Sequence, residues 1–174
     1  LNLSSGLLNN YYSILISKNL GSKENISKSI TILENQIKIT DMITTNQKNS
    51  YIDNIYLNAH KIEQNIKSKE NLLSLSKVIK NLIEKDPEIY NALIWNAKIM
   101  SIKGMEEEKI YNQIKSAIEL SPASVQAYRF ALDYSHKKNN KNKFDKYCTD
   151  YHKAFLGSYT IKNNLSRFSE TSLT

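Results

Sequence analysis

The sequence is poor in the residues that interrupt regular structure and in the residue that cross-links chains. It has 4 glycines, 2 prolines and 1 cysteine among 174 residues. A fold made of many short strands needs a turn signal about every 8–12 residues, and so few breakers exclude it. The single cysteine, Cys148, excludes an internal disulfide. These shortages, with abundant leucine, isoleucine, lysine and glutamine, predict an all-α fold.

Arginine is also scarce, although the chain is basic. The net charge is +7, and Arg129 and Arg167 are the only arginines among 24 basic residues. Specific nucleic-acid sites rely on the bidentate guanidinium group. We therefore expect no specific nucleic-acid binding, and a non-specific basic binder remains an alternative. The sequence has no run of 18 apolar residues, so it predicts no membrane-spanning helix.

Two segments with a similar pattern of residues, each predicted to begin a helix, lie 35 residues apart in the sequence. KDPEIYNALIWNAKI begins at Lys85, and LSPASVQAYRFALDY begins at Leu120. With Pro87 set on Pro122, Ala92 falls on Ala127. Internal periods of this length are typical of helical-repeat proteins, in which each helix pair buries its apolar face against the next pair.

The apolar residues repeat with the same step. Ile110, Ile114, Ala117 and Leu120 share one face of a predicted helix. The stripe recurs 35 residues earlier and 34 residues later, and a residue that tolerates a left-handed backbone stands at two of the predicted turns. These further positions are Leu75, Ile79 and Leu82, then Phe144, Cys148 and Tyr151, with Gly104 and Asn139 at the turns.

This pattern resembles the tetratricopeptide repeat (TPR) family, with about three copies over residues 55–156. Asn96 and Ala131 depart from the family's usual leucine, and Phe144 stands where alanine is usual. The resemblance implies antiparallel helix pairs stacked as a short TPR-like α-solenoid. The residues that carry it are Leu93, Ala97, Gly104, Ile110, Ile114, Ala117, Leu120 and Pro122.

The two ends of the chain are predicted differently from its middle. Within residues 1–50 we expect a degenerate helix pair from about Leu7 to Ile43, followed by a polar linker at residues 44–50, TTNQKNS. Residues 51–156 form the predicted TPR-like repeats. Residues 157–174 lack periodicity and are interpreted as a tail or as the lead into a further domain.

The resemblance also implies a partner-binding groove, because the first helix of each TPR pair lines the concave face. Its ligand is expected to be a protein or an extended peptide with acidic character. Carried over by position, the groove residues are His60, Gln64 and Lys67 from the first copy, Asn91, Ile94 and Lys98 from the second, and Gln126, Arg129 and Asp133 from the third.

Other chemistry is expected to be absent. Cys148 and His152 share a helix face, but a metal site needs further ligands and a nucleophile needs an orienting group. Cys148 lies on the apolar stripe and is predicted to be a core residue. We expect neither catalysis nor a cofactor, and a stand-alone enzyme is the alternative class. The basic run HKKNNKNK from His136 to Lys143 is predicted to be a solvated loop, with contact to anionic lipid or an acidic partner as the alternative.

The predicted function is a non-catalytic scaffold for protein–protein interaction, forming one domain of a larger protein. TPR-like segments also occur as soluble arms of membrane-anchored bacterial envelope proteins of the O-antigen ligase and polymerase type. On that alternative the chain would lie at the cytoplasmic or the periplasmic face of a bacterial envelope. The sequence itself fixes neither compartment nor oligomeric state.

Overall fold

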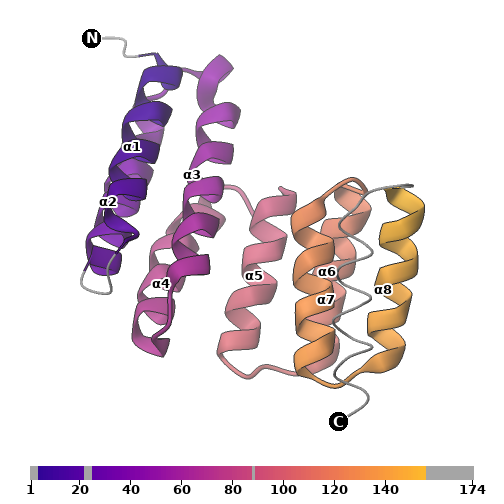
Figure 1. The fold of residues 1–174 in the computed structure, drawn as a ribbon. Coiled ribbons are helices and arrows are strands. Elements are labelled where there is room, and N and C mark those ends of the chain that lie inside the picture. Colours follow the sequence, from indigo (N-terminus) through magenta and orange to yellow (C-terminus); the bar gives the residue numbers. More distant parts are fainter. Residues whose placement is uncertain (1–3, 22–24, 88, 156–174) are drawn as a thin grey trace. The chain divides into compact units, whose positions relative to one another are not determined.

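The computed structural model describes residues 4–21, 25–87 and 89–155, and these residues fold into helices joined by short turns (Figure 1). No strand occurs in this part of the chain, so the predicted all-α class is confirmed. Contacts divide the chain into two compact units, Leu1–Pro87 (unit 1) and Glu88–Thr174 (unit 2). The predicted tail at residues 157–174 lies outside the described residues.

Unit 1 is built around three mutually packed helices, with a fourth beside two of them. Helix α1 packs on both α2 and α3, and α4 packs mainly on α2. Helices α1 and α2 occupy the region predicted as a helix pair, from about Leu7 to Ile43. The elements are α1 (Ser5–Asn19), α2 (Ile26–Lys38), the 3-10 helix η2 (Ile39–Met42), α3 (Thr45–Asn65) and α4 (Lys69–Lys85).

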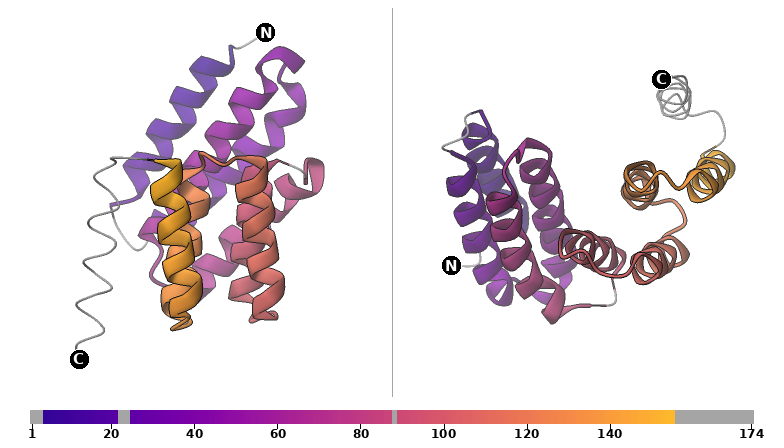
Figure 2. Two further views of the ribbon diagram at one scale, coloured as in Figure 1. Left: turned by 90° about the vertical axis from the view of Figure 1, so that its right-hand side faces the viewer. Right: turned by 90° about the horizontal axis from the view of Figure 1, so that it is seen from below.

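Unit 2 consists of two consecutive helix hairpins. Helix α5 pairs with α6 and α7 pairs with α8, while α7 also contacts both α5 and α6. Viewed nearly along their axes, the four helices alternate from side to side (Figure 2, right). The elements are α5 (Tyr90–Ile102), α6 (Glu107–Leu120), α7 (Val125–Lys137) and α8 (Lys141–Ala154).

The backbone conformation at the end of two helices repeats with the predicted period of 35 residues. In both cases the helix ends just before a proline. Asp86 closes α4 with φ −148° and ψ 83°, and Ser121, 35 residues later, closes α6 with φ −138° and ψ 83°. In both, the amide donates to the carbonyl four residues earlier. The extended conformation is the one that a following proline favours, so Pro87 and Pro122 produce matching helix ends.

The turns inside the two hairpins of unit 2 also match. Gly104 has φ 67° and Asn139 has φ 52°, and they are the two described residues with a left-handed backbone. After each of them, the next amide donates to the carbonyl five residues earlier, at 3.0 Å and 2.9 Å. This is the Schellman arrangement, and it confirms the prediction for both positions.

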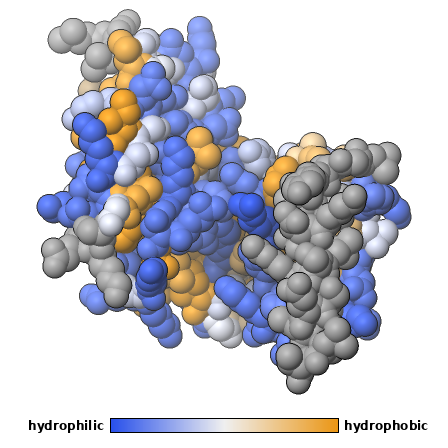
Figure 3. Space-filling view, in the orientation of Figure 1, coloured by the Kyte–Doolittle hydropathy of each residue, from blue (hydrophilic) through white to orange (hydrophobic). Residues whose placement is uncertain are grey.

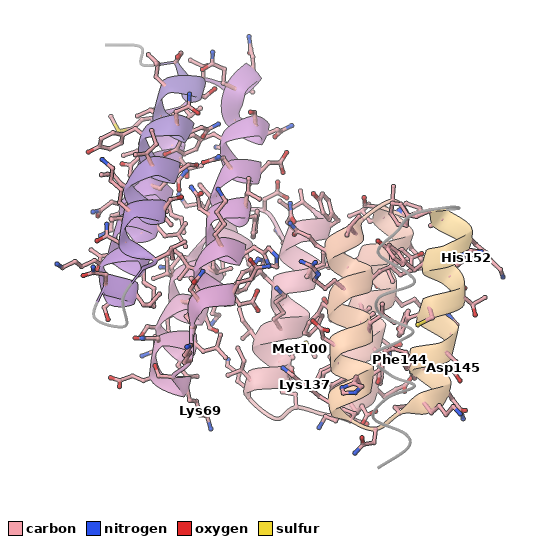
Figure 4. The ribbon with its side chains drawn as sticks, viewed as in Figure 1. Lys69, Met100, Lys137, Phe144, Asp145 and His152 are labelled. Carbon is pink, nitrogen blue, oxygen red and sulfur yellow. The ribbon has the colours of Figure 1, made fainter. Side chains whose placement is uncertain are left out.

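The predicted apolar stripes form the cores of both units, with one exception. Leu75, Ile79 and Leu82 on α4 are at most 1% exposed, and the stripes of α6 and α8 are likewise buried. On α2, the apolar residues Ile26, Ile30, Leu33 and Ile37 are buried too. Leu120 is the exception, because it is the last residue of α6 and is 55% exposed. Phe144 points from α8 toward α7, whereas Asp145 and His152 lie on the outer side of α8 (Figure 4).

Two predicted boundaries are wrong. The polar segment at residues 44–50 is not a linker, because α3 begins at Thr45. These residues extend the helix that buries Tyr51 and Ile52, and the Gln47 side-chain oxygen accepts a hydrogen bond from the Ser5 amide at 3.0 Å. The region 51–156 is also not one contact unit, since the division falls after Pro87.

Candidate partner-binding groove

The residues predicted from the first copy lie at the end of α3 in unit 1. His60 is half-buried, with its Nδ1 atom 3.4 Å from Glu63 Oε2 and its Nε2 atom 3.0 Å from the Gln64 amide nitrogen. Lys67 is exposed but follows the last helical residue, Asn65. His60 and Gln64 therefore form a local polar cluster, and Lys67 belongs to the turn rather than to the first helix.

The residues predicted from the second copy are buried, so that part of the prediction is wrong. Asn91 is 4% exposed, Ile94 is 2% exposed and Lys98 is 9% exposed. Ile94 packs in an apolar cluster with Ala117 and Ala127. The physical reason is that α5 carries apolar residues around most of its circumference and is buried on more than one face.

The residues predicted from the third copy are accessible to different degrees. Gln126 is half-buried, and Arg129 and Asp133 are exposed one turn apart on α7. The nine predicted residues are thus divided between two units. In unit 2, the exposed members come from α7 alone.

A groove does occur on unit 2, but between the second helices of the two hairpins. It has a volume of about 440 Å³ and runs between α6 and α8. We call it the α6–α8 groove. Its lining residues are Glu108, Tyr111, Asn112, Lys115, Ile118 and Glu119 from α6, and Lys143, Lys146, Tyr147 and Asp150 from α8.

Two tyrosines form the floor of this groove. The rings of Tyr111 and Tyr147 stack with centroids 6.2 Å apart and an interplanar angle of 22°. Burial raises the pKa of both phenols, that of Tyr147 to about 12. The Tyr111 hydroxyl donates to Ser135 Oγ at 3.3 Å. The floor is therefore neutral, rigid and aromatic at physiological pH, a chemistry that is common at recognition surfaces.

Charged side chains form the rim. Lys115 and Lys146 each pair with a carboxylate one turn further along their own helix, at 3.6 Å and 2.9 Å. Lys143 differs from them, because its ammonium lies 4.8 Å from the centre of the Tyr111 ring. No carboxylate of the described residues is in salt-bridge contact with Lys143.

The turn between α7 and α8 positions Lys143. Asn140 caps α8 by accepting the Lys143 amide at 3.1 Å, and its side-chain nitrogen donates to Glu107 at 3.3 Å. This links the beginnings of α6 and α8. The first turn of α8 contains no acidic residue of its own, and the carboxylate at this helix end is that of Glu107 on α6.

The cysteine does not offer nucleophilic chemistry. Cys148 is 8% exposed within the aromatic cluster of unit 2. Burial raises the pKa of its thiol to about 11, with Asp145 as a lesser cause. A nucleophilic thiol needs the opposite shift, so the predicted core role of Cys148 is supported. Over the described ranges, no three His, Cys, Asp or Glu side chains are grouped closely enough to hold a metal ion.

Two tyrosines outside the apolar stripes of the repeat are a feature of the sequence that could have indicated this groove. Tyr111 and Tyr147 each lie beside a stripe residue, Ile110 and Cys148, rather than on the stripe itself. In a two-helix packing, such flanking positions lie at the edge of the contact. Large amphipathic residues there, with lysines one turn away, could have indicated a surface between α6 and α8.

Comparisons of the chain with models of known protein families, with curated proteins and with solved structures find no match. Among residues 4–21, 25–87 and 89–155, no helix combines the length and the apolar character needed to cross a membrane.

Proposed function

We propose that this chain is a non-catalytic module for protein–protein interaction, built as a TPR-like α-solenoid, which binds an acidic segment of another protein in the α6–α8 groove. The observation that carries the proposal is Lys143. It is a cation over an aromatic floor, with no carboxylate in salt-bridge contact in the described structure, in a first helical turn that contains no acidic residue.

The helical-repeat interpretation is supported by the matching helix ends at Asp86 and Ser121 and by the matching turns at Gly104 and Asn139. Within unit 2, helix α7 of one hairpin packs on α5 and α6 of the other, as in repeat arrays. Grooves between packed helices are a known site for extended peptides.

The lining holds three lysines and three carboxylates, so the preference for an acidic ligand rests on two of the lysines, Lys143 and Lys146. A carboxylate of the partner can approach Lys143 without displacing an existing ion pair. Lys146 is 64% exposed and pairs only within its own helix. Such exposed pairs are worth about 0–1 kcal/mol, so a second carboxylate can compete with Asp150 for it. The tyrosine floor offers flat apolar contact to the peptide between these charges.

The test is selection from a displayed library of random peptides against the intact chain. We expect the enriched peptides to contain Asp or Glu beside an apolar or aromatic residue. The double variant Lys143→Glu/Lys146→Glu should bind them at least about tenfold more weakly, since like charges at a contact repel.

The matched control is Lys28→Glu/Lys77→Glu, which makes the same charge change at two exposed lysines of α2 and α4. It should retain binding. Equal loss in both double variants would show that only net charge matters. Selected peptides without an acidic bias, or undiminished binding by the groove variant, would contradict the proposal.

A further inference from the structure

The ion pairs on the two walls of the α6–α8 groove have the same order along their helices. On α8, the Lys146 ammonium lies 2.9 Å from Asp150 Oδ2, and on α6 the Lys115 ammonium lies 3.6 Å from Glu119 Oε1. In each pair the carboxylate follows the lysine by four residues, which is about 6 Å along the helix axis. Each wall therefore presents a cation and, one turn further on, an anion.

The two walls also run in the same direction. The Asn140 side chain, which caps the beginning of α8, donates to Glu107, the first residue of α6, at 3.3 Å. Both helices therefore begin at the same end of the groove, and the order from lysine to carboxylate is shared by both walls. Hydrophilic residues cover most of the described surface in view in Figure 3. The shared order, rather than the presence of charge, is what carries information about a ligand.

Binding of an acidic ligand changes the surroundings of one carboxylate of the groove. When a ligand carboxylate pairs with Lys146, Asp150 loses its ion-pair partner. The Asp150 side chain is 35% exposed, against 64% for Lys146, so water replaces the lost partner less well than it would at a fully exposed position. A ligand that also carries a cation at this point restores an ion pair to Asp150, and a purely acidic ligand does not.

The separation of Lys146 and Asp150 along α8 fits two residues of an extended peptide. Such a peptide advances about 3.3 Å per residue, and its successive side chains point to opposite sides. Two residues that flank a third therefore lie about 6.6 Å apart on the side of the rim. The residue between them points toward the floor formed by Tyr111 and Tyr147. An acid, an apolar or aromatic residue and a base in succession match the rim and the floor together.

We propose that the ligand of the α6–α8 groove is a mixed-charge peptide, with an acidic residue paired to Lys146, an apolar or aromatic residue on the tyrosine floor and a basic residue paired to Asp150. This inference rests on the proposed function, since it needs a peptide in the groove. Lys143, over the Tyr111 ring, offers a further contact to the acidic part of the peptide. The remaining lining carboxylate, Glu108, stands in the first turn of α6, and the exchange at Lys146 does not involve it.

Two end-capped peptides that differ at one residue test the inference. Gly-Ser-Glu-Phe-Gln-Ser-Gly is acidic, and Gly-Ser-Glu-Phe-Lys-Ser-Gly has mixed charge. Each is titrated to millimolar concentration into the isotopically labelled intact chain, and the amide NMR signals of α6 and α8 give its dissociation constant. We expect the mixed-charge peptide to bind about threefold more tightly, as one exposed ion pair allows. The chain's net charge of +7 would by itself favour the acidic peptide, so the expected order is not a general charge effect.

Asp150→Asn should reverse this order. The variant removes the group that competes with the ligand carboxylate for Lys146, so the acidic peptide should bind about threefold more tightly than it binds the wild type. The mixed-charge peptide loses its carboxylate partner and should no longer have the advantage. The matched control is Asp145→Asn, the same change at an exposed residue on the outer side of α8 (Figure 4). It should leave the preference for the mixed-charge peptide as in the wild type.

The outcomes separate this inference from the proposed function. Equal affinity of the two peptides for the wild type, or tighter binding of the acidic one, would overturn the inference and leave the proposed function standing. An unchanged preference in Asp150→Asn, with loss of the preference in Glu108→Gln, would overturn it by assigning the basic residue to the other end of the groove. If neither peptide shifts the signals of α6 and α8, the proposed function is contradicted together with the inference.

Discussion

The cores of the two units are built from different side chains. Between α1, α2 and α3, unit 1 encloses a ring of four hydrogen bonds. Ser13 donates to Asn58, Asn58 to Gln36, Gln36 to Asn54, and Asn54 back to Ser13, over distances of 2.9–3.3 Å. Gln36 and Asn58 are fully buried. Each member both donates and accepts within the ring.

The core of unit 2 contains packed aromatic rings instead of a hydrogen-bonded ring. Tyr111 meets Tyr134 edge-on at 5.3 Å, and Tyr128 meets Tyr151 at 5.4 Å. The buried polar side chains of unit 2 include Ser135, which accepts from Tyr111 and donates to its own helix. Ring contacts of this kind add about 0.5–1.5 kcal/mol beyond area burial and tolerate small shifts.

The difference bears on how each core specifies its packing. Gln36 and Asn58 are buried and Asn54 is partly buried, so polar residues stand among the inward-facing positions of α2 and α3. A closed ring of directional bonds is satisfied by one arrangement of the three helices. Unit 1 therefore gains specificity from buried polar residues, whereas the core of unit 2 is mainly aromatic and aliphatic.

The largest expected effect is the disruption of the unit 2 core by Ala117→Asp. Ala117 is fully buried in the apolar cluster with Ile94 and Ala127, so the variant places an unpaired carboxylate there. We expect a loss of about 3–5 kcal/mol in the free energy of unfolding. Urea denaturation followed by the fluorescence of Trp95, the one tryptophan, measures it in unit 2 directly.

The neighbouring variant Ser116→Asp is the control, because Ser116 is exposed on the same helix. It should unfold at nearly the wild-type urea concentration. If the two variants melt alike, Ala117 is not in a closed core and the packing of α6 described above is wrong.

The second effect tests the ring in unit 1. Asn58→Ala removes two bonds of the ring and leaves the buried Gln36 oxygen without its donor. We expect a loss of about 1–3 kcal/mol, visible as faster hydrogen exchange in α1–α3. Asn35→Ala, at an exposed position on α2, should have little effect.

A double variant sharpens the comparison. Gln36→Leu/Asn58→Leu replaces both buried amides with apolar groups of similar size, and it should cost less than the sum of the two single changes. Strict additivity would show that the four side chains do not act as one network, and that unit 1 is held by apolar packing as unit 2 is.

The contrast between apolar packing and polar hydrogen bonding also explains which features could be predicted from the sequence. Stripe residues such as Ile114 and Ile79 are buried as predicted, because period and apolarity alone place them. The start of α3 was not predictable, since the polar run before Tyr51 resembles a linker until the Ser5–Gln47 hydrogen bond is known. The polar ring was also hidden, because its members touch only after three helices assemble.

The predicted groove residues and the α6–α8 groove lie on different helices. The residues that the TPR resemblance implies are on the first helix of each pair, and those on α5 are buried. An extended surface between helices is nevertheless present, formed by α6 and α8. Local spacing shows which residues share a face of one helix, but the choice of face depends on how the hairpins pack.

A smaller effect concerns the tyrosine hydroxyls of unit 2. The Tyr134 hydroxyl is buried and has no hydrogen-bond partner in the described structure. Tyr134→Phe removes this unsatisfied group and should raise stability by up to about 1 kcal/mol. Tyr111→Phe loses the bond to Ser135 and should lower stability by about 1 kcal/mol. Thermal denaturation of both variants compares them, and a loss in Tyr134→Phe would reveal a hidden partner.

The smallest effect is the pH response of the unit 2 core, reported by Cys148. With a thiol pKa of about 11, labelling of the native chain by a thiol reagent should be slow at pH 8. Its rate should rise about tenfold per pH unit up to pH 10, whereas the rate for a free thiol levels off near pH 9.

The raised thiol pKa also makes stability depend on pH. Because the folded pKa lies above the unfolded one, the folded state binds more protons between about pH 9 and 11, so the free energy of unfolding falls as pH rises through that window. The buried tyrosines, whose pKa values are also raised, act in the same direction above pH 10. Rapid labelling at pH 8 without denaturant would show instead that the aromatic core of unit 2 opens readily.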